Sequence, residues 1–458
     1  MKNIFILTNS FPPQNIVGAL RPYRLAKRIG HHGWRCIIIT KPPMDTNSLD
    51  FSLLEELTPD TIIQYLYKTD FIRMDDKNKI QESIYKYRKH SGNKPFRENR
   101  LFESIRGNLR ILLDQYLLVP DMDILHVSTY IKNVNSILKI SEDNVILTTS
   151  PSHSIHMAGY FLSKKGLPWV ADFRDPWDNY PETGHYELLN PIERMMEKMV
   201  IEQADAVIST TRTNTDNLVK KHSQISQKKF FTITNSYDKE KVDIPATKDP
   251  NKFVISYTGI FYAEKDPFTF FRALRSWLNV LNDKEKDKIE KILRIQLIGS
   301  KSKAVLKMVN DLKIDHVVRF VDRVSHEEAI RLTKTSDMVL ISSGIGSKTR
   351  PGWLLSKLFE YLGCRIPILA ICREGEMAKI IRETNSGYVI TSEDHKAIHS
   401  ILEKEINGKL TGNTNGNFTF VGVDQYEEKH TISQMINIIE NVLNDYNSSS
   451  FTKQLNSK

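Results

Sequence analysis

Residues 170–181, VADFRDPWDNYP, gather side-chain types that could do chemistry. An apolar run typical of the end of a buried strand is followed directly by Arg174, Asp175 and Trp177. An arginine fork can hold a phosphate or carboxylate through two hydrogen bonds, and a carboxylate can orient a hydroxyl. An indole offers a flat apolar face to a ligand ring. The segment therefore predicts a binding or catalytic site, with a buried salt bridge and a core tryptophan as the alternatives.

Two further polar segments precede it in the chain. The turn SPSHSIHMAG sets His153 and His156 at the start of a predicted helix, where they could bind substrate, cap the helix or pack in the core. A metal site is not expected there, because no third ligand follows at a short interval. Asp121 and Asp123 form a DxD tripeptide, which can hold a divalent cation on a diphosphate. Its position after a proline favours a loop or a helix cap instead.

The first predicted turn, TNSFPPQNIVGALRPYR, puts Gly18 at a helix start. A glycine there lets backbone N–H groups approach a phosphate, whose charge the helix dipole favours. Taken alone, Gly18 is better explained by a tight turn. The sequence has neither a GxGxxG nor a GxxxxGK[ST] pattern, which argues against a dinucleotide oxidoreductase and a P-loop enzyme.

The second half of the chain offers two comparable turns. In YTGIFYAEKDP, Gly259 ends a strand and Lys265 precedes a helix. In GSKTRPGWLLSKLFEYL, a glycine-rich basic loop leads into another helix. Small residues, positive charge and a helix N-terminus together suit a diphosphate. The charged positions of this second turn are Lys348, Arg350, Lys357 and Glu360.

Lys357 and Glu360 are three residues apart and so share one face of the predicted helix. Such a pair could be a surface ion pair. Beside the basic loop, however, a carboxylate just inside the helix also suits the hydroxyls of a ribose. We therefore treat Glu360 as a candidate ligand-binding residue.

Short apolar runs alternate with longer helical patterns in both halves of the chain. NIFILT, VGALRPYRLAKRIGHHG and WRCIIIT read as strand, helix and strand, which predicts a parallel sheet. A polar stretch at 239–252 separates this series from a second one that begins with FVISYTG. Two doubly wound α/β domains in tandem are predicted, and ligands bind beyond the carboxyl ends of the strands in such domains.

The same patterns suggest where the domains begin and end. We expect a first domain over 1–240 with a basic insertion near 43–118, and a second domain over 250–422. A final helix is expected over 423–446, and the polar tail 447–458 is expected to be disordered.

The composition, 40% hydrophobic and 26% charged over 458 residues, is that of a globular protein. Short apolar runs, an N-terminus unlike a signal peptide and three scattered cysteines predict a cytoplasmic protein. The net charge is +9, and residues 71–110 contain 11 Lys and Arg against 5 Asp and Glu. That segment is either a solvated helical region or a contact with an anionic membrane surface. No motif predicts binding to nucleic acid.

Taken together, these segments resemble a known family. FPP, GALRPYRLAKRI, TSPSHSIHMAG, PWVADFRDPW, ADAVISTT, YTGIFYAEKDP and PGWLLSKLFEYLGCRIPILAI occur in the order and spacing of the retaining nucleotide-sugar glycosyltransferases of family 4, or glycosyltransferase group 1. The similarity covers most of residues 1–400 and is closest to bacterial members that build surface polysaccharides.

The resemblance implies a GT-B fold, an α/β architecture of two Rossmann-like, doubly wound parallel-sheet domains facing across a cleft. The last helix is expected to cross back to the first domain. The donor, a UDP- or GDP-sugar, would bind the C-terminal domain and a saccharide acceptor the N-terminal one. No cofactor or metal would be required, because helix N-termini and basic side chains would stabilise the departing diphosphate.

Carried over by position, Gly18 falls on the glycine loop near the donor phosphates and Lys265 on the phosphate-binding lysine. Glu360 falls on the second glutamate of the paired-glutamate motif, which binds the donor ribose. Three positions depart from the family pattern. Gly352 replaces the first glutamate, Ile260 the phosphate arginine, and Arg174 the histidine after the strand; Lys348, Arg350 or Lys357 could supply the missing charge.

The predicted function is transfer of a hexose to a saccharide, a lipid-linked polysaccharide or oligosaccharide precursor, at the inner face of the membrane. Arg174, Asp175 and Glu360 are the predicted catalytic residues. The alternatives are a sugar-nucleotide epimerase of the same fold and a catalytically degenerate binding subunit. Substrate contacts are expected from Gly18, His153, His156, Trp177, Gly259, Lys265, Lys348, Arg350, Lys357 and Glu360.

Overall fold

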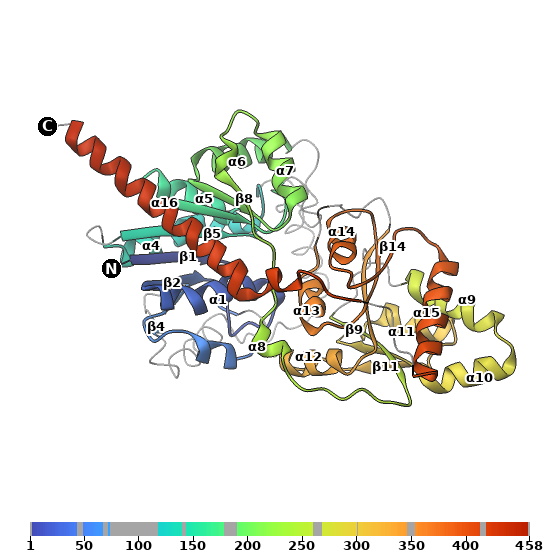
Figure 1. Cartoon of the computed structure of the whole chain (residues 1–458). Coiled ribbons are helices and arrows are strands. Elements are labelled where there is room, and N and C mark those ends of the chain that lie inside the picture. Colours follow the sequence, from blue (N-terminus) through green and yellow to red (C-terminus); the bar gives the residue numbers. More distant parts are fainter. Residues whose placement is uncertain are drawn as a thin grey trace, which may run out of the picture. The chain divides into compact units, whose positions relative to one another are not determined.

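The computed structural model divides into two compact units (Figure 1). The first comprises Met1–Thr210, Asn214–Ile233 and Ile432–Lys458, and the second comprises Thr211–Thr213 and Thr234–Thr431. The residues that the structure describes are 2–43, 49–66, 72–73, 118–139, 143–177, 190–259, 268–299, 301–345, 352, 354–412 and 418–456.

The first unit is built on an eight-stranded sheet of order β4-β3-β2-β1-β5-β6-β7-β8. All pairings are parallel except that of β4 with β3. The strands are short and rich in isoleucine and valine, which suit a sheet covered on both faces. They are β1 (Lys2–Thr8), β2 (Trp34–Thr40), β3 (Ile62–Tyr65), β4 (Ile72–Arg73), β5 (Asp143–Thr149), β6 (Trp169–Phe173), β7 (Ala206–Ser209) and β8 (Phe230–Thr232).

Successive residues of β1 face opposite sides of this sheet, as the two-residue repeat of a strand requires. Ile4 and Ile6 belong to one core, and Phe5 and Leu7 to the other. The helical segments of this unit are α1 (Val17–Ile29), η1 (Gly30–His32), η2 (Ser52–Glu56), η3 (Met122–His126), α4 (Val127–Ile137), α5 (Ile155–Ser163), α6 (Asn190–Gln203), α7 (Arg212–Lys221) and η6 (Gln227–Lys229).

The second unit is built on a six-stranded parallel sheet of order β11-β10-β9-β12-β13-β14. Its strands are β9 (Phe253–Thr258), β10 (Leu293–Ile298), β11 (Val318–Val321), β12 (Met338–Gly344), β13 (Ile368–Cys372) and β14 (Gly387–Ile390). Its helical segments are α8 (Lys239–Val242), α9 (Phe268–Val280), α10 (Asp283–Ile292), α11 (Lys303–Asp311), α12 (His326–Lys334), α13 (Lys357–Cys364), α14 (Glu376–Glu383), α15 (His395–Leu410) and η8 (Val423–Tyr426).

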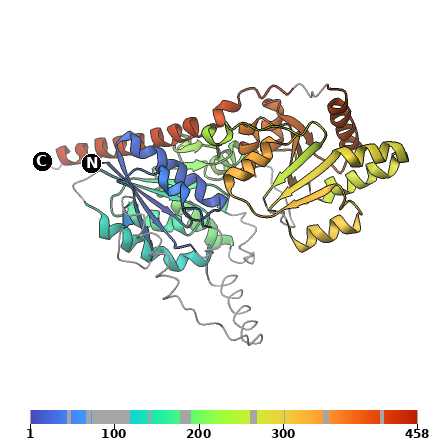
Figure 2. The same ribbon diagram turned by 90° about the horizontal axis from the view of Figure 1, so that it is seen from below.

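The chain ends in a long helix, α16 (Glu428–Asn456), which runs alongside the first unit (Figure 2). Ile432, Ile436 and Ile439 join the same core as Ile4 and Ile6. The helix differs from the prediction, because it continues through residues 447–456, which the sequence assigned to a disordered tail. Neither glycine nor proline stands in this stretch to end the helix.

The predicted fold class, two α/β units with parallel sheets, is confirmed. Part of the predicted insertion near 43–118 belongs to the first sheet, since β3 pairs in parallel with β2. Residues 74–117, the rest of its basic part, lie outside the described residues. Among the described helices, none is long and apolar enough to span a membrane.

Candidate functional site

Strand register aligns the loops of the first unit that carry predicted site residues. Thr8 of β1 pairs with Thr149 of β5, and Thr149 pairs with Asp172 of β6. The three strands therefore end at one level of the sheet. The loops that follow them meet at its carboxyl edge, where ligands bind in open α/β sheets.

Arg174 joins two of these loops. Its Nε donates to the carbonyl of Ser150, after β5, and its Nη1 donates to the carbonyl of Gly18, in the first turn of α1. The hydroxyl of Thr210 donates to the Arg174 carbonyl at 2.7 Å. A Cβ at Gly18 would lie 3.8 Å from Arg174 Nη2. The structure therefore brings together Arg174 and Gly18, which the sequence separates by 156 positions.

The two histidines and the tryptophan lie behind this edge, in the core. His156 is fully buried, stacks on Phe173 at 4.4 Å between ring centroids, and shares a 2.7 Å hydrogen bond between its Nδ1 and Thr148 Oγ1. Burial lowers the pKa of His156 well below its ordinary value, helped by the nearby His153 and Arg174. The imidazole is therefore neutral at physiological pH.

His153 and Trp177 complete this aromatic cluster, with 5.2 Å between their ring centroids. His153 Nε2 lies 3.0 Å from the Asp175 carbonyl, to which it donates when protonated at that nitrogen. Trp177 is 3% exposed and offers no open face to a ligand ring. The sequence left open whether Trp177 faces a ligand or packs in the core, and in this structure it packs in the core.

The DxD tripeptide organises the same edge, in the loop or capping role that the sequence favoured. Asp121 caps η3 by accepting from the Asp123 N–H at 2.9 Å, and it accepts from the Ser154 N–H at 3.1 Å. Burial raises the pKa of Asp121, against the two hydrogen bonds from Ser154 that lower it. Asp123 accepts from the ammonium of Lys41, from the amide of Asn9 at 2.8 Å and from the hydroxyl of Ser152 at 2.5 Å.

Sequence reasoning missed one pair at this edge. Asp172, the last residue but one of β6, is buried and accepts from Arg21 Nε and Nη2, both at 2.9 Å. Thr149 donates to the same carboxylate at 2.8 Å. The signal was present, because an acid inside an otherwise apolar strand needs a partner.

In the second unit, Lys357 and Gly259 come together at the carboxyl end of β9. Lys357 Nζ donates to the Thr258 carbonyl at 2.6 Å and lies 3.8 Å from the ring centroid of Tyr257. Gly259 has a φ of +99°, and a Cβ there would lie 3.2 Å from Lys357 Nζ. A glycine is thus favoured both by the backbone conformation and by the ammonium next to it.

Glu360 lies one helical turn further along α13. Its Oε1 is 2.7 Å from His326 Nε2, at the start of α12, and both side chains are about one fifth exposed, 23% and 22% respectively. His326 is another residue that the sequence did not single out. Lys265, Lys348 and Arg350 lie outside the described residues, as does Ile260.

Comparison with known proteins finds a family similarity within the second unit. Residues 238–418 match the family model described as "Glycosyl transferases group 1". The matched segment contains Lys357, Gly259 and Glu360. A search of curated protein sequences finds no match for this chain.

Solved structures resemble the chain over almost its whole length. Sucrose-phosphate synthase from Thermosynechococcus elongatus is 12% identical, with a TM-score of 0.64, 97% of this chain covered and 100% of that one. Anabaena HepE in complex with UDP-glucose is 14% identical, with a TM-score of 0.60 and 96% and 99% covered. A glycosyltransferase from Rickettsia africae is 14% identical, with a TM-score of 0.61 and 96% and 98% covered.

At these identities the structural likeness shows the fold alone, and the family similarity concerns residues 238–418. The chain therefore has the GT-B fold, and its residues 238–418 are similar to the glycosyltransferases of group 1.

Proposed function

We propose that this chain is a retaining, metal-independent glycosyltransferase that moves a hexose from a nucleoside diphosphate sugar to a saccharide acceptor. The observation that carries the proposal is the start of α13, inside the matched segment. There Lys357 Nζ lies at the Gly259 turn, 2.6 Å from the Thr258 carbonyl, and Glu360 follows one turn later. A cation beside a glycine suits a diphosphate, and a carboxylate one helical turn later suits the hydroxyls of a ribose.

The donor is proposed to be a UDP-sugar. Anabaena HepE, which shares the fold, has been solved with UDP-glucose. On this proposal Lys357 neutralises the diphosphate, with Lys265, Lys348 and Arg350 adding positive charge, and Glu360 accepts from the ribose hydroxyls. Preorganised cations of this kind stabilise the charge that develops as the sugar–phosphate bond breaks.

In the first unit, Arg174 and Gly18 are proposed to serve the reaction together. The guanidinium already donates to the Gly18 and Ser150 carbonyls, so its position is set before any ligand binds. Asp175 is proposed to orient the acceptor hydroxyl. His153 holds the Asp175 backbone, while His156 and Trp177 support the loop from the core.

The acceptor is proposed to be a lipid-linked precursor of a surface polysaccharide or oligosaccharide, reached from the cytoplasmic side of the inner membrane. The basic composition of residues 71–110 supports contact with an anionic surface.

A thermal-shift screen of nucleotide sugars tests the donor assignment, because a ligand that binds only the folded protein raises its melting temperature. The best donor is then incubated with lipid-linked saccharides in the presence and absence of EDTA. We expect a glycosylated product with a retained anomeric configuration, equally with and without EDTA. An epimer formed from UDP-N-acetylglucosamine alone would favour the epimerase, and donor binding without transfer would favour the binding subunit.

A further inference from the structure

Helix α6 buries two of its charged residues and exposes two of its large apolar ones. Glu193 and Glu197 are 5% and 1% exposed, whereas Ile192 and Met195 are 43% and 55% exposed. At these four positions the helix departs from the usual arrangement of a surface helix, which puts apolar side chains inward and charges outward.

The inward face of α6 is accounted for by its contacts. Glu197 accepts from Lys221 and lies 3.3 Å from His222 Nε2, while Val200 and Ile201 pack in the core. These contacts fix the rotation of the helix. Ile192, Met195 and Met199, spaced by three and four residues, then form a stripe along another face, beside Met196, which packs partly against the core.

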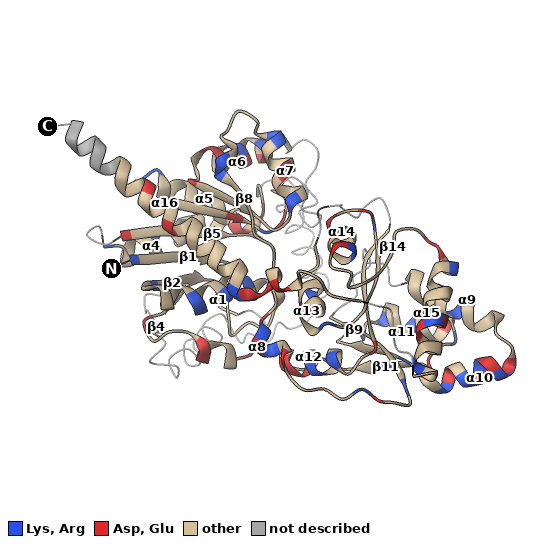
Figure 3. Ribbon diagram, viewed as in Figure 1, with Lys and Arg blue, Asp and Glu red and all other residues tan. Residues whose placement is uncertain are grey.

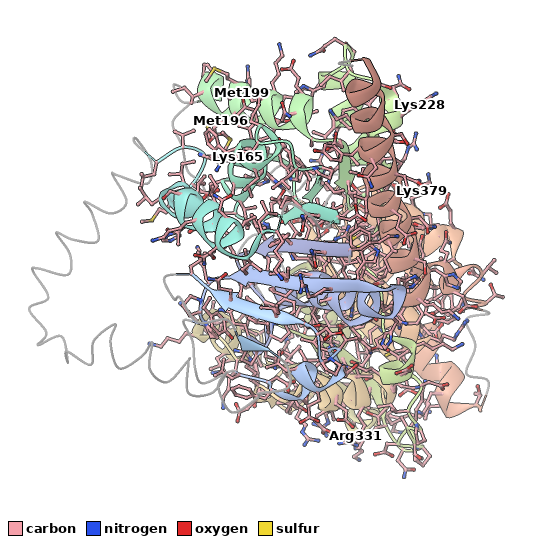
Figure 4. The ribbon with its side chains drawn as sticks, turned by 90° about the vertical axis from the view of Figure 1, so that its left-hand side faces the viewer. Lys165, Met196, Met199, Lys228, Arg331 and Lys379 are labelled. Atoms are coloured by element: carbon pink, nitrogen blue, oxygen red, sulfur yellow. The ribbon has the colours of Figure 1, made fainter. Side chains whose placement is uncertain are left out.

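The end of α5, which packs against α6, carries a further exposed apolar side chain and two lysines. Phe161 is 46% exposed, and Lys164 and Lys165, just after the helix, are exposed as well. Helices α5 and α6 pack against each other. Figure 4 shows Lys165 beside Met196 and Met199. We call Phe161, Lys164, Lys165, Ile192, Met195 and Met199 the α5–α6 patch.

The patch collects apolar surface that is otherwise scattered. Of the ten large apolar side chains that are exposed within the described residues, three lie here: Phe161, Ile192 and Met195. Clustered exposed apolar side chains mark a surface that meets another apolar phase or a partner.

The charges around the patch decide which partner fits. Lys164, Lys165 and Arg194 are exposed, and Lys198 pairs with Glu202 at 3.6 Å. Figure 3 shows basic and acidic positions along α6. An apolar centre with a basic rim matches a bilayer that carries anionic headgroups. A symmetric dimer would press one basic rim against another, so a second copy of the chain fits less well.

We propose that the α5–α6 patch docks on an anionic lipid surface, with Phe161, Ile192 and Met195 in the headgroup region and Lys164 and Lys165 on lipid phosphates. The proposal deepens the proposed function, which calls for a lipid-linked acceptor, by naming the face that meets the membrane. The test of this proposal requires neither donor nor acceptor. Membrane docking can therefore be disproved while the transferase activity is confirmed, and the transferase activity can be disproved while docking is confirmed.

The test is sedimentation of the full chain with vesicles of equal parts phosphatidylglycerol and phosphatidylcholine, or of phosphatidylcholine alone, at low salt. Two double variants probe the patch: Phe161→Ser with Met195→Ser, and Lys164→Glu with Lys165→Glu. Matched controls are Val280→Ser, an apolar residue 73% exposed in α9, and Lys284→Glu with Lys288→Glu, exposed on α10. Circular dichroism checks that every variant is folded.

We expect the wild type and both controls to bind anionic vesicles. The two patch variants should bind these vesicles at least about tenfold more weakly. Wild-type binding by folded patch variants would overturn the proposal, because another segment would then hold the protein on the membrane. Failure of the wild type to bind would overturn it too. The proposal would also be overturned if light scattering found that the wild type is a dimer and that the patch variants are monomers.

Discussion

Arg21 binds Asp172 through two parallel hydrogen bonds, from Nε to Oδ2 and from Nη2 to Oδ1, each 2.9 Å long. Both side chains are almost fully buried, at 7% and 1% exposure. Arg21 lies three residues after Gly18, and Asp172 lies two residues before Arg174. The pair therefore ties the first turn of α1 to the end of β6 and fixes where Gly18 and Arg174 meet.

Asp172→Asn should destabilise the first unit strongly. The substitution leaves the Arg21 guanidinium buried without its counter-charge, which costs about 3–5 kcal/mol in the free energy of unfolding. Urea denaturation measures this loss. Asp287→Asn is the matched control, because the Asp287–Lys291 pair is exposed and should contribute nothing measurable. Equal midpoints for the two variants would show that the buried pair does not hold these elements together.

The stability of the fold should depend on the charge state of His156. Burial lowers the pKa of this histidine in the folded protein, whereas in the unfolded chain it stays near its ordinary value of about 6.5. Below that pH the unfolded state binds more protons than the folded state, so stability falls as the pH drops. One such site contributes a slope of about 1.4 kcal/mol per pH unit between the two pKa values.

His156→Gln removes this titration while keeping a side chain that can bond to Thr148. We expect the variant to be less stable at neutral pH but to lose less stability than the wild type between pH 6.5 and 5. Denaturation at a series of pH values gives the difference in slope. Identical slopes in the two proteins would mean that folding does not lower the pKa of His156.

Two glycines of the first unit, Gly159 in α5 and Gly18 in α1, should respond in opposite ways to alanine. A Cβ at Gly159 would lie 2.2 Å from the Trp169 ring, so Gly159→Ala must displace a buried indole and cost about 1–3 kcal/mol or more. At Gly18 the nearest atom is at 3.8 Å. Gly18→Ala should therefore keep the fold and gain up to about 1 kcal/mol from helix propensity. Thermal unfolding distinguishes the two outcomes.

Gly18→Ala also tests the role proposed for the α1 turn. A methyl group beside Arg174 hinders close approach of a phosphate without unfolding the protein, so transfer activity should fall while the melting temperature is kept or rises. Undiminished turnover in a stable variant would remove Gly18 from the proposed site.

Glu360→Gln should weaken donor binding. Hydrogen bonds to a charged acceptor contribute about 1.5–3 kcal/mol, which corresponds to a rise of roughly 10- to 150-fold in Kd. Calorimetric titration with the donor found in the screen measures it. Glu374→Gln, on an exposed carboxylate paired with Arg382, is the control and should bind as the wild type does. The same affinity in both variants would rule out Glu360 as the ribose ligand.

Much of the architecture is predictable from sequence, because the relevant signal is local. The isoleucine-rich run before Thr8 and the helical pattern that starts at Gly18 each depend on neighbouring residues, and their alternation predicts a parallel sheet. The carboxyl-edge positions of Gly18 and Arg174 follow from that topology alone. The end of α16 was not predictable in this way, since its asparagines and serines only weakly disfavour a helix.

The partners of the charged residues were decided by the tertiary structure. Asp172 and Arg21 stand 151 positions apart, and Glu360 and His326 stand 34 apart, so no local pattern joins them. The sequence by itself determined the strands, the helices and the edge at which their loops gather. Only the folded chain decided which side chains meet there, because a buried charge takes whichever partner the packed elements bring within hydrogen-bond distance.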